Sequence, residues 1–270
     1  MKRSDAQIFI LSHKKEDFVI DNDLFTPIEV GAYYNDIPQY NLRDNLNEDN
    51  ISKLNPIYLE QTGVYYIYKH LADNYKYIGL NQHRRQFDVS EDADFDELFS
   101  QYKIILHKED LPASIIMQYY MAHNIDDLDL VLKIILEKDN SYSDIINQLN
   151  YINFLFTNAS YITTSDVFKD YCSFYFDVMS KFLKEKNIYN IEDAIKYGKE
   201  ISEDPDKVIL NDDFKKLTTS DIYQARLCGY LQERIFTIYV LKNFNLDDIC
   251  DITFRDIKEE TYHLDTIYKE

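Results

Sequence analysis

Two adjacent arginines, Arg84 and Arg85, follow a short apolar run at residues 75–80 that is typical of a buried strand. The chain is acidic, with 48 Asp and Glu residues against 29 Lys and Arg and a formal net charge of −19, so paired cations at such a place are unusual. In open α/β sheets, ligands bind beyond the carboxyl ends of the strands. A planar guanidinium donates paired hydrogen bonds to phosphate oxygens. The pattern therefore indicates a nucleotide or nucleotide-sugar site.

The end of the first expected strand indicates the same chemistry. Residues 7–11 form a compact apolar run, and His13 and Lys14 follow it. In a doubly wound sheet this is where a nucleotide base or phosphate is expected. Taken alone, the two side chains fit a nucleotide site and a solvated strand end equally well.

Two further polar segments fit either a ligand contact or a turn. Asp49 and Asn50 offer acceptors and an amide donor that suit uracil or ribose hydroxyls, but an Asp-Asn pair is also typical of turns. Asn158 separates two segments that we expect to be extended, residues 151–157 and 160–163. It therefore either faces donor or acceptor, or forms the turn between these segments.

A metal site has a sequence candidate in Asp127-Leu128-Asp129. The apolar positions that follow predict a helix through this segment, and residues two apart on a helix point in different directions. The two carboxylates therefore cannot share a metal unless the helix begins after Asp129. Negative charge at a helix N-terminus is the favoured role. His123 lies just before the segment and is a candidate for lining a pocket.

Glu233 and Arg234 interrupt a helical pattern at residues 231–239 that is apolar on nearly all sides, within a buried-looking helix expected over residues 231–244. Buried charges are costly unless they are paired or functional. Glu233 is therefore either half of an internal ion pair, in which Arg226 can take part, or a catalytic base whose pKa burial raises. Glu60 is a weaker candidate for the same base.

The elements that must position these residues alternate along the chain. Strand-like runs at residues 7–11, 75–80 and 102–106 are separated by helical patterns, and a helical stretch covers residues 114–150. This alternation predicts an α/β fold. Residues 16–53 form a long, irregular polar segment, which in a compact domain is usually functional.

Capping residues mark two helix starts. Asn55 followed by Pro56 predicts a helix with Asn as its cap, and Thr164 predicts the cap of a strongly amphipathic helix. Neither an internal repeat nor a domain boundary is visible. We therefore expect one domain over residues 1–270, with helical additions on its C-terminal side.

Composition restricts the partners. The acidic balance disfavours nucleic acid, whose binding depends on cation–phosphate contacts, and broad docking on anionic membranes. Three scattered cysteines fit buried thiols in a reducing cytoplasm rather than disulfides or zinc ligands. Neither a signal peptide nor a run of ~20 apolar residues is visible, so we expect a cytoplasmic protein with at most peripheral membrane association.

Six separated segments together resemble one known family. They are residues 9–14 (FILSHK), 27–32 (PIEVGA), 49–52 (DNIS), 77–85 (YIGLNQHRR), 123–129 (HNIDDLD) and 226–234 (RLCGYLQER). In this order they are similar to bacterial capsular and exopolysaccharide synthesis glycosyltransferases, long filed as a domain of unknown function. Characterised relatives transfer galactofuranose from a UDP donor. The resemblance covers residues 7–240 and leaves residues 241–270 as a variable tail.

The chain departs from the family pattern in two places. The family usually has Thr-Gly before the Asp-Asn pair, where this chain has Asn47 and Glu48, and His-Tyr-Arg-Arg where this chain has residues 82–85 (QHRR). The basic end is kept, so the resemblance still implies that Arg84 and Arg85 bind the donor diphosphate. The different residues at positions 82 and 83 bear on the choice of sugar or acceptor.

The resemblance implies a GT-A-like fold, a Rossmann-type nucleotide-sugar-binding sheet with helical additions. It also implies an inverting hexosyl transfer from a UDP-sugar, with galactofuranose or galactose as the expected sugar. The expected acceptor is a hydroxyl of a growing glycan or lipid-linked oligosaccharide at the inner face of the cytoplasmic membrane. We expect no required cofactor, and manganese or magnesium is not favoured because the strand end carries cations.

The resemblance further implies roles for individual residues. Glu233, Arg84 and Arg85 are expected in catalysis. The residues expected to bind the donor nucleotide are His13, Lys14, Asp49, Asn50, Asn81, His83 and Asn158. Two alternatives stay open. One is a metal-dependent nucleotide-sugar hydrolase or phosphotransferase that uses Asp126, Asp127 and Asp129, and the other is a non-catalytic glycan- or nucleotide-binding module.

Overall fold

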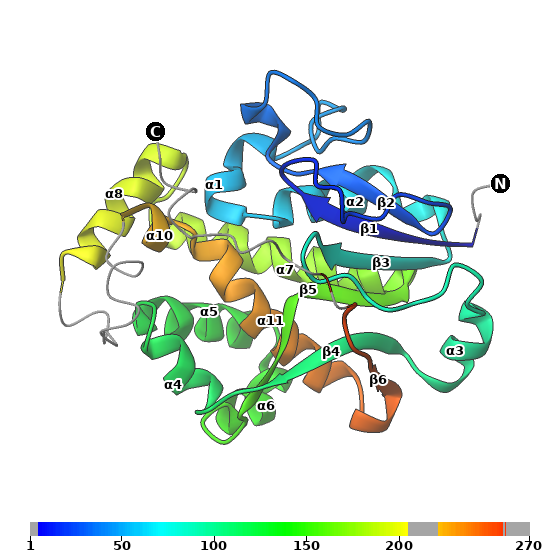
Figure 1. Ribbon diagram of the computed structural model, residues 1–270. Helices are drawn as coiled ribbons and strands as arrows, with labels where there is room; N and C mark the ends of the chain where they lie inside the picture. Colours follow the sequence, from blue (N-terminus) through cyan, green and yellow to red (C-terminus); the bar gives the residue numbers. More distant parts are fainter. Residues whose placement is uncertain (1–4, 205–220, 256, 258–270) are drawn as a thin grey trace.

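The computed structural model describes residues 5–204, 221–255 and 257. Within these ranges six strands form a sheet in the order β2-β1-β3-β5-β4-β6 (Figure 1). They are β1 (Ala6–Ser12), β2 (Phe25–Glu29), β3 (Tyr77–Gln82), β4 (Ile104–Asp110), β5 (Phe154–Thr164) and β6 (Ile249–Asp251). β1 pairs in parallel with both β2 and β3, whereas β5 runs antiparallel between β3 and β4. The carboxyl ends of β1, β2 and β3 therefore lie at one edge of the sheet.

Helices pack on both faces of this sheet. The described α-helices are α1 (Asn55–Tyr58), α2 (Gln61–His70), α3 (Phe95–Gln101), α4 (Ile115–Tyr120), α5 (Ile125–Lys138), α6 (Ser143–Gln148), α7 (Ser165–Glu185), α8 (Ile191–Ser202), α10 (Asp221–Ala225) and α11 (Leu227–Asn243). α2, α5, α7 and α11 share a large core with Leu11 and Leu80 on one face. On the other face, α3 closes a smaller core around Ile8 and Ile10.

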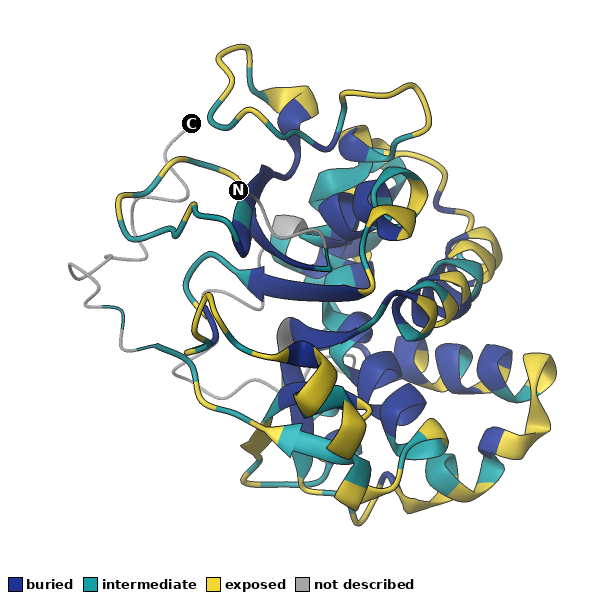
Figure 2. Cartoon of the chain, turned by 90° about the vertical axis from the view of Figure 1, so that its right-hand side faces the viewer, coloured by how far each residue is buried: buried dark blue, intermediate teal, exposed yellow. Residues whose placement is uncertain are grey.

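The first strand lies between the two cores, and all seven of its residues are buried. Phe9 and Leu11 belong to the larger core, while Ile8 and Ile10 belong to the smaller one. A parallel strand covered on both faces requires such a continuous apolar run, so the prediction of a buried first strand is confirmed. Figure 2 shows the same contrast, with buried inner strands and exposed residues on the outer turns of the helices.

The capped helix expected at Thr164 is also confirmed. Thr164 is the N-cap of α7, and its side chain accepts a hydrogen bond from the Val167 backbone N–H. Thr164 is also the last residue of β5, so the chain passes from strand to helix without a loop. The expected face of α7 packs into the larger core through residues such as Phe168, Tyr175 and Val178.

The prediction that residues 16–53 are irregular is wrong in part, because β2 lies within them. β2 pairs with β1 in parallel, with Pro27 opposite Ile10. Pro27 weakens the strand pattern in the sequence, but it is tolerated because β2 is an edge strand of the described sheet. β6, three residues long and parallel to β4, was likewise not expected in the tail.

The expected division of residues 151–163 into two extended segments is wrong. β5 is one continuous strand, and Asn158 lies within it rather than in a turn. Its pairing with β4 is irregular at this point, because the step from Leu106 to Lys108 on β4 corresponds to the longer step from Tyr161 to Phe156 on β5, so the extra residues lie on β5 around Asn158. The Asn158 side chain lies outside the described part of the structure. The helical stretch expected at residues 114–150 is divided among α4, α5 and α6.

The helix expected to open at Asn55 is interrupted. α1 ends at Tyr58 and α2 begins at Gln61, because Leu59 has φ 52° and ψ −134° and cannot continue a helix. Leu54, not Asn55, occupies the N-cap of α1. The Asn55 side chain instead donates to the carbonyl oxygen of Leu59 at 2.8 Å. Asn55 therefore stabilises the break rather than the helix start.

None of the helices in the described ranges has both the length and the hydropathy needed to cross a membrane.

Candidate functional site

The ends of β1 and β3 bring two histidines together. Leu11 pairs with Gln82, and the backbone N–H of His83 donates to the Leu11 carbonyl oxygen at 3.1 Å. His13 and His83 follow at the same edge of the sheet, with ring centroids 5.2 Å apart and planes nearly perpendicular. Two segments that are 70 residues apart in the chain, one after the first strand and one after the third, therefore meet at this edge.

A tight turn after β3 separates the roles of the two arginines. The Arg85 backbone N–H donates to the Gln82 carbonyl oxygen at 3.0 Å, and the Gln86 side chain donates to the His83 carbonyl oxygen at 2.6 Å. Arg85 is exposed, whereas Arg84 is half-buried and lies close enough to lower the pKa of both histidines. Arg84 thus belongs to the histidine cluster, and Arg85 faces solvent.

Burial and neighbouring cations keep both histidines uncharged. Burial lowers the pKa of His83 to about 4, with further contributions from His13 and Arg84. Burial also lowers the pKa of His13, followed by the charges of Lys14 and Arg84 and, more weakly, Arg226; Glu16 opposes them. At neutral pH the positive charge of the cluster therefore resides on its arginines and on Lys14, which forms an ion pair with Glu16 at 2.7 Å.

Carboxylates lie on the other side of this cluster. Glu60, between α1 and α2, accepts a hydrogen bond from the Gln82 side chain at 3.1 Å. Burial raises the pKa of Glu60, and the nearby charge of Glu233 raises it further. A hydrogen bond from its own backbone and the charge of Arg226 oppose this rise. Glu233 itself forms an ion pair with Arg234, whose Nη1 lies 3.1 Å from the Glu233 Oε2. The expected internal ion pair is therefore present, and its carboxylate also acts on Glu60.

The sequence did not predict a contact with this cluster for two of its residues. Arg226 is the N-cap of α11 and acts on both His13 and Glu60, although the sequence suggested it only as an ion-pair partner. The Gln82 side chain donates a hydrogen bond to Glu60. In the sequence, Gln82 was notable only because it departs from the family pattern. Neither role is visible in one segment, because each depends on contacts between β3, α2 and α11.

Asp49 and Asn50 make their described contacts within their own loop and with α2. Asp49 accepts a hydrogen bond from the Tyr65 hydroxyl at 2.8 Å. Asn50 donates to the Asn47 carbonyl oxygen and accepts from the Ser52 backbone N–H, which is the turn geometry left open by the sequence. These contacts place neither side chain against the histidine cluster.

Asn81 lies beneath the site rather than on its surface. It is fully buried, and its side-chain oxygen accepts a hydrogen bond from the Phe87 backbone N–H at 3.2 Å. This contact holds the return of the chain after the 82–85 turn. In this conformation Asn81 therefore supports the arginine turn from below.

The Asp126–Asp129 segment does not gather its carboxylates around one point. α5 begins at Ile125, and Asp127 is buried in an ion pair with Lys186 at 2.6 Å, where it also accepts from the Tyr197 hydroxyl. Asp126 and Asp129 are exposed. Among the residues that the structure describes, no group of three His, Cys, Asp or Glu side chains is arranged to hold a metal ion.

His123 lies in an aromatic stack next to the carboxylate side of the site. Its ring is buried, with centroids 4.1 Å from Tyr230 and 5.7 Å from Tyr223, and burial lowers its pKa well below the ordinary value. Tyr230 and Glu233 are three residues apart on α11 and therefore lie on neighbouring positions of that helix. Burial in this stack therefore keeps the His123 ring uncharged beside α11.

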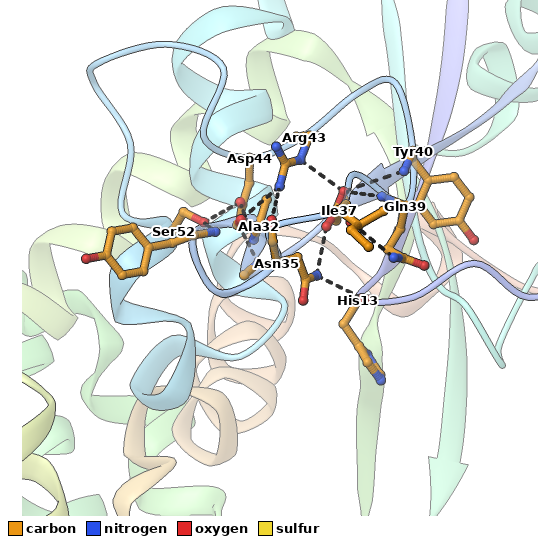
Figure 3. A network of polar contacts seen from close by, with 12 residues as sticks. His13, Ala32, Asn35, Ile37, Gln39, Tyr40, Arg43, Asp44 and Ser52 are labelled. Atoms are coloured by element: carbon orange, nitrogen blue, oxygen red, sulfur yellow. Dashed lines mark hydrogen bonds and ion pairs between the residues drawn. The ribbon is translucent and has the colours of Figure 1, made fainter.

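Two buried carboxylates organise the loop that borders the site (Figure 3). Asp44 accepts hydrogen bonds from the backbone N–H groups of Gly31 and Ala32 and from the hydroxyls of Ser52 and Thr62. Gly31 has φ 67°, a conformation that favours glycine and turns both N–H groups toward the carboxylate. The loop is thereby tied to α2.

Glu29 holds the other half of the loop. It accepts from the Asn35 side chain at 2.7 Å and from the Gln39 backbone N–H at 2.9 Å, and it pairs with Arg43 at 3.0 Å. Asn35 also donates to the His13 carbonyl oxygen at 3.3 Å, a contact drawn in Figure 3. The loop therefore reaches the histidine cluster through its own buried anchor.

A cavity of 350 Å³ adjoins this arrangement, between residues 15–21, strand β2 and residues 38–42. Lys15 and Glu16 line it, and the Lys14 carbonyl oxygen accepts from the hydroxyl of Tyr40, another lining residue. The cavity thus begins where the His13–Lys14 segment ends. Its volume lies within the ~300–1,000 Å³ typical of small-molecule sites.

Replacing Asp44 tests whether its four donors anchor the loop. Asp44→Ala leaves two backbone N–H groups and two hydroxyls without their acceptor in a buried place, and each such group costs about 1–3 kcal/mol. We expect the free energy of unfolding to fall by at least about 3 kcal/mol in urea denaturation. The control Asp129→Ala, at an exposed carboxylate, should change it by less than about 0.5 kcal/mol. Equal stability of the two variants would contradict the anchor.

The lowered pKa of His83 predicts a pH dependence. Between pH 6.5 and about 4 the unfolded chain binds a proton at this histidine and the folded chain does not, so His83 makes the fold less stable as pH falls through this window. His83→Gln removes that contribution, and the variant should lose less stability than the parent between pH 7 and 4. The His83 ring resonances should titrate near pH 4 in NMR spectra. A midpoint near 6.5 would contradict the burial of this ring.

Residues 7–199 match the model of a family described as "Domain of unknown function (DUF4422)". Among solved structures, the chain is similar to the apo structure of the WbbM bifunctional glycosyltransferase, with a TM-score of 0.69 and 19% sequence identity. The match covers 94% of this chain and 46% of the other, so this chain spans about half the length of that protein. No curated protein matches the chain. The structural likeness confirms the predicted GT-A-like α/β fold.

Proposed function

The chain belongs to the DUF4422 family, and from this premise we propose that it is a glycosyltransferase that takes its sugar from a UDP donor. One observation carries the proposal: Arg84 lies beside two histidines, kept uncharged by burial and nearby cations, at the shared carboxyl edge of β1 and β3. In α/β sheets this edge is the ligand side. The fold likeness to a glycosyltransferase supports the same reading.

The leaving diphosphate accounts for the cations. As the bond between the anomeric carbon and the phosphate oxygen breaks, negative charge grows on UDP, and fixed guanidiniums stabilise it without a proton transfer. Arg84 is placed for this role, and Arg85 is close enough in the chain to join it when a ligand covers the turn. Because cations rather than carboxylates occupy this strand end, we propose a transfer that requires no divalent metal.

We assign the donor nucleoside to the neighbouring cavity. We place the nucleoside between residues 15–21 and 38–42, with His13 and Lys14 between it and the diphosphate. Asp49, Asn50, Asn81 and Asn158 stay assigned to the donor only by the family resemblance. Asn81 would act through the turn that it supports.

The transferred sugar and the acceptor lie on the carboxylate side in this proposal. The acceptor hydroxyl attacks the anomeric carbon, its proton passes to a carboxylate, and UDP departs from the opposite face with inversion. Glu233 is the expected base or an orienting charge. We propose galactofuranose or galactose as the sugar and a growing capsular, O-antigen or exopolysaccharide glycan as the acceptor, met at the inner face of the cytoplasmic membrane.

Calorimetric titration with UDP in EDTA tests the donor site. We expect saturable binding that Arg84→Ala weakens at least about tenfold, because a charge-assisted hydrogen bond contributes about 1.5–3 kcal/mol. Uridine lacks the phosphates, so its affinity should not change in this variant. Lys53→Ala, at an exposed cation outside the cluster, should leave UDP binding unchanged.

Other outcomes of this titration favour the alternatives. Binding that requires manganese and survives Arg84→Ala would support a metal-dependent hydrolase or phosphotransferase. UDP binding without consumption of UDP-galactofuranose or UDP-galactose would support a binding module. The absence of UDP binding in both EDTA and manganese would overturn the proposed donor.

A further inference from the structure

The break between α1 and α2 places a bulky residue in a strained conformation. Leu59 has φ 52° and ψ −134°, a region that is rare for residues with a side chain and costs about 1–3 kcal/mol. Among the described residues, Asn187 is the other non-glycine with positive φ, and it ends a helix, where such a residue is common. Strain of this kind persists only where surrounding contacts impose it, and it is often found at functional sites.

The contacts around Leu59 impose the strain. Its backbone N–H donates to the Asn55 carbonyl oxygen at 2.7 Å, and its carbonyl oxygen accepts from the Asn55 side chain at 2.8 Å. Its side chain packs directly on Gly229 of α11, where an added Cβ would lie 2.3 Å from the Leu59 Cδ1. Gly229 thus lets α11 approach Leu59 and keep it in place.

The consequence of the break is the position of Glu60. In a continuous helix Glu60 would follow the turn of α1, whereas here it caps α2 and its carboxylate reaches the end of β3. There it accepts from Gln82, the residue directly before His83 and Arg84. The strained residue therefore moves a carboxylate to the same sheet edge as the proposed diphosphate site.

The charged groups that face Glu60 come from several elements. Glu233 and Arg226 of α11 act on it directly, and Gln82 of β3 is its hydrogen-bond donor. His13, at the end of β1, lies close enough to Arg84 and Arg226 for both charges to lower its pKa. Of these, Glu233 favours the protonated form of Glu60 and Arg226 favours the ionised form.

The two carboxylates differ in their ability to accept a proton. Glu233 pairs with Arg234, whose side chain is only 3% exposed, so protonation of Glu233 would take this counter-charge from a buried guanidinium. The described hydrogen-bond donors to Glu60 are neutral, the Gln82 side chain and its own backbone, and burial raises its pKa, with a further contribution from Glu233. Glu60 is therefore the better proton acceptor of the two, because its raised pKa favours the protonated form and it has no described ion-pair partner, whereas Glu233 is held in an ion pair.

We propose that Glu60 is the general base of the sugar transfer, and that Glu233 is a positioning residue that acts on it through its charge. This inference rests on the proposed function. The Glu60 carboxylate takes the proton of the acceptor hydroxyl as its oxygen bonds to the anomeric carbon, and the electron pair of the broken bond leaves with UDP. Gln82 fixes the orientation of the carboxylate for this step.

The test compares Glu60→Gln with Glu233→Gln in the full chain, with UDP-galactofuranose or UDP-galactose as donor and octyl β-galactopyranoside as acceptor. Glu60→Gln should lower kcat by at least about 100-fold, the lower end of general-base contributions, with KM for the donor and UDP affinity within about twofold of the parent. Glu60→Asp, which keeps the charge on a shorter chain, should lose less. Glu200→Gln, at an exposed glutamate of α8, should match the parent.

The pH profile separates the roles. Removing the negative charge of Glu233 lowers the pKa of Glu60, so Glu233→Gln should keep kcat within about tenfold of the parent and move the acidic limb of kcat/KM to lower pH. In Glu60→Gln that limb should disappear from the residual activity. Thermal unfolding of each variant checks that the fold is retained.

Three results would overturn the assignment. The first is parent-like kcat in Glu60→Gln, and the second is a loss of the acidic limb in Glu233→Gln with Glu60→Gln unaffected, which would make Glu233 the base. In both cases UDP binding and donor consumption by the parent keep the proposed function intact. The third is a parent that neither binds UDP nor consumes either donor, and this result removes the proposed function together with Glu60.

Discussion

The parallel pairing of β1 with β3 is the constraint on which the rest of the site depends. It sets Leu11 opposite Gln82, so that His13 and His83 leave the sheet side by side. A shift of one residue would turn the side chains of β3 to the other face and separate Gln82 from Glu60. The register is secured because β1 is buried on both faces, where any slip would expose apolar side chains or bury polar ones.

Around this pairing, positively charged and negatively charged side chains gather in two separate places. Cations gather at the end of β3 and carboxylates at the α1–α2 break and on α11, with Arg226 acting on both groups. Because the whole chain has a net charge of −19, the general field does not attract an anionic donor. In the proposed function, the diphosphate is therefore bound by short-range contacts with Arg84 in a half-buried place, where solvent and salt screen charge less.

The sequence predicted elements that local signals define. The buried run of β1 and the Thr164 cap of α7 are such elements, since each depends on a few consecutive residues. β2 escaped prediction because Pro27 weakens its pattern and its pairing with β1 determines it. The strand-end cluster of His13, His83 and Arg84 could be expected, because the carboxyl ends of parallel strands lie at one edge of the sheet. The contribution of Arg226 could not, because it arises where α11 meets two other segments.

The break at Leu59 shows why the carboxylate side was harder to predict than the cationic side. Asn55 and Pro56 favour a helix start, and no local residue signals that this helix must stop at Tyr58. The signal is Gly229, about 170 residues later, because only a residue without a side chain lets α11 touch Leu59. Local preference and tertiary packing thus disagree at one residue. The Asn55 hydrogen bonds and the contact with α11 compensate the strain at Leu59. As a result, the Glu60 carboxylate lies beside the end of β3.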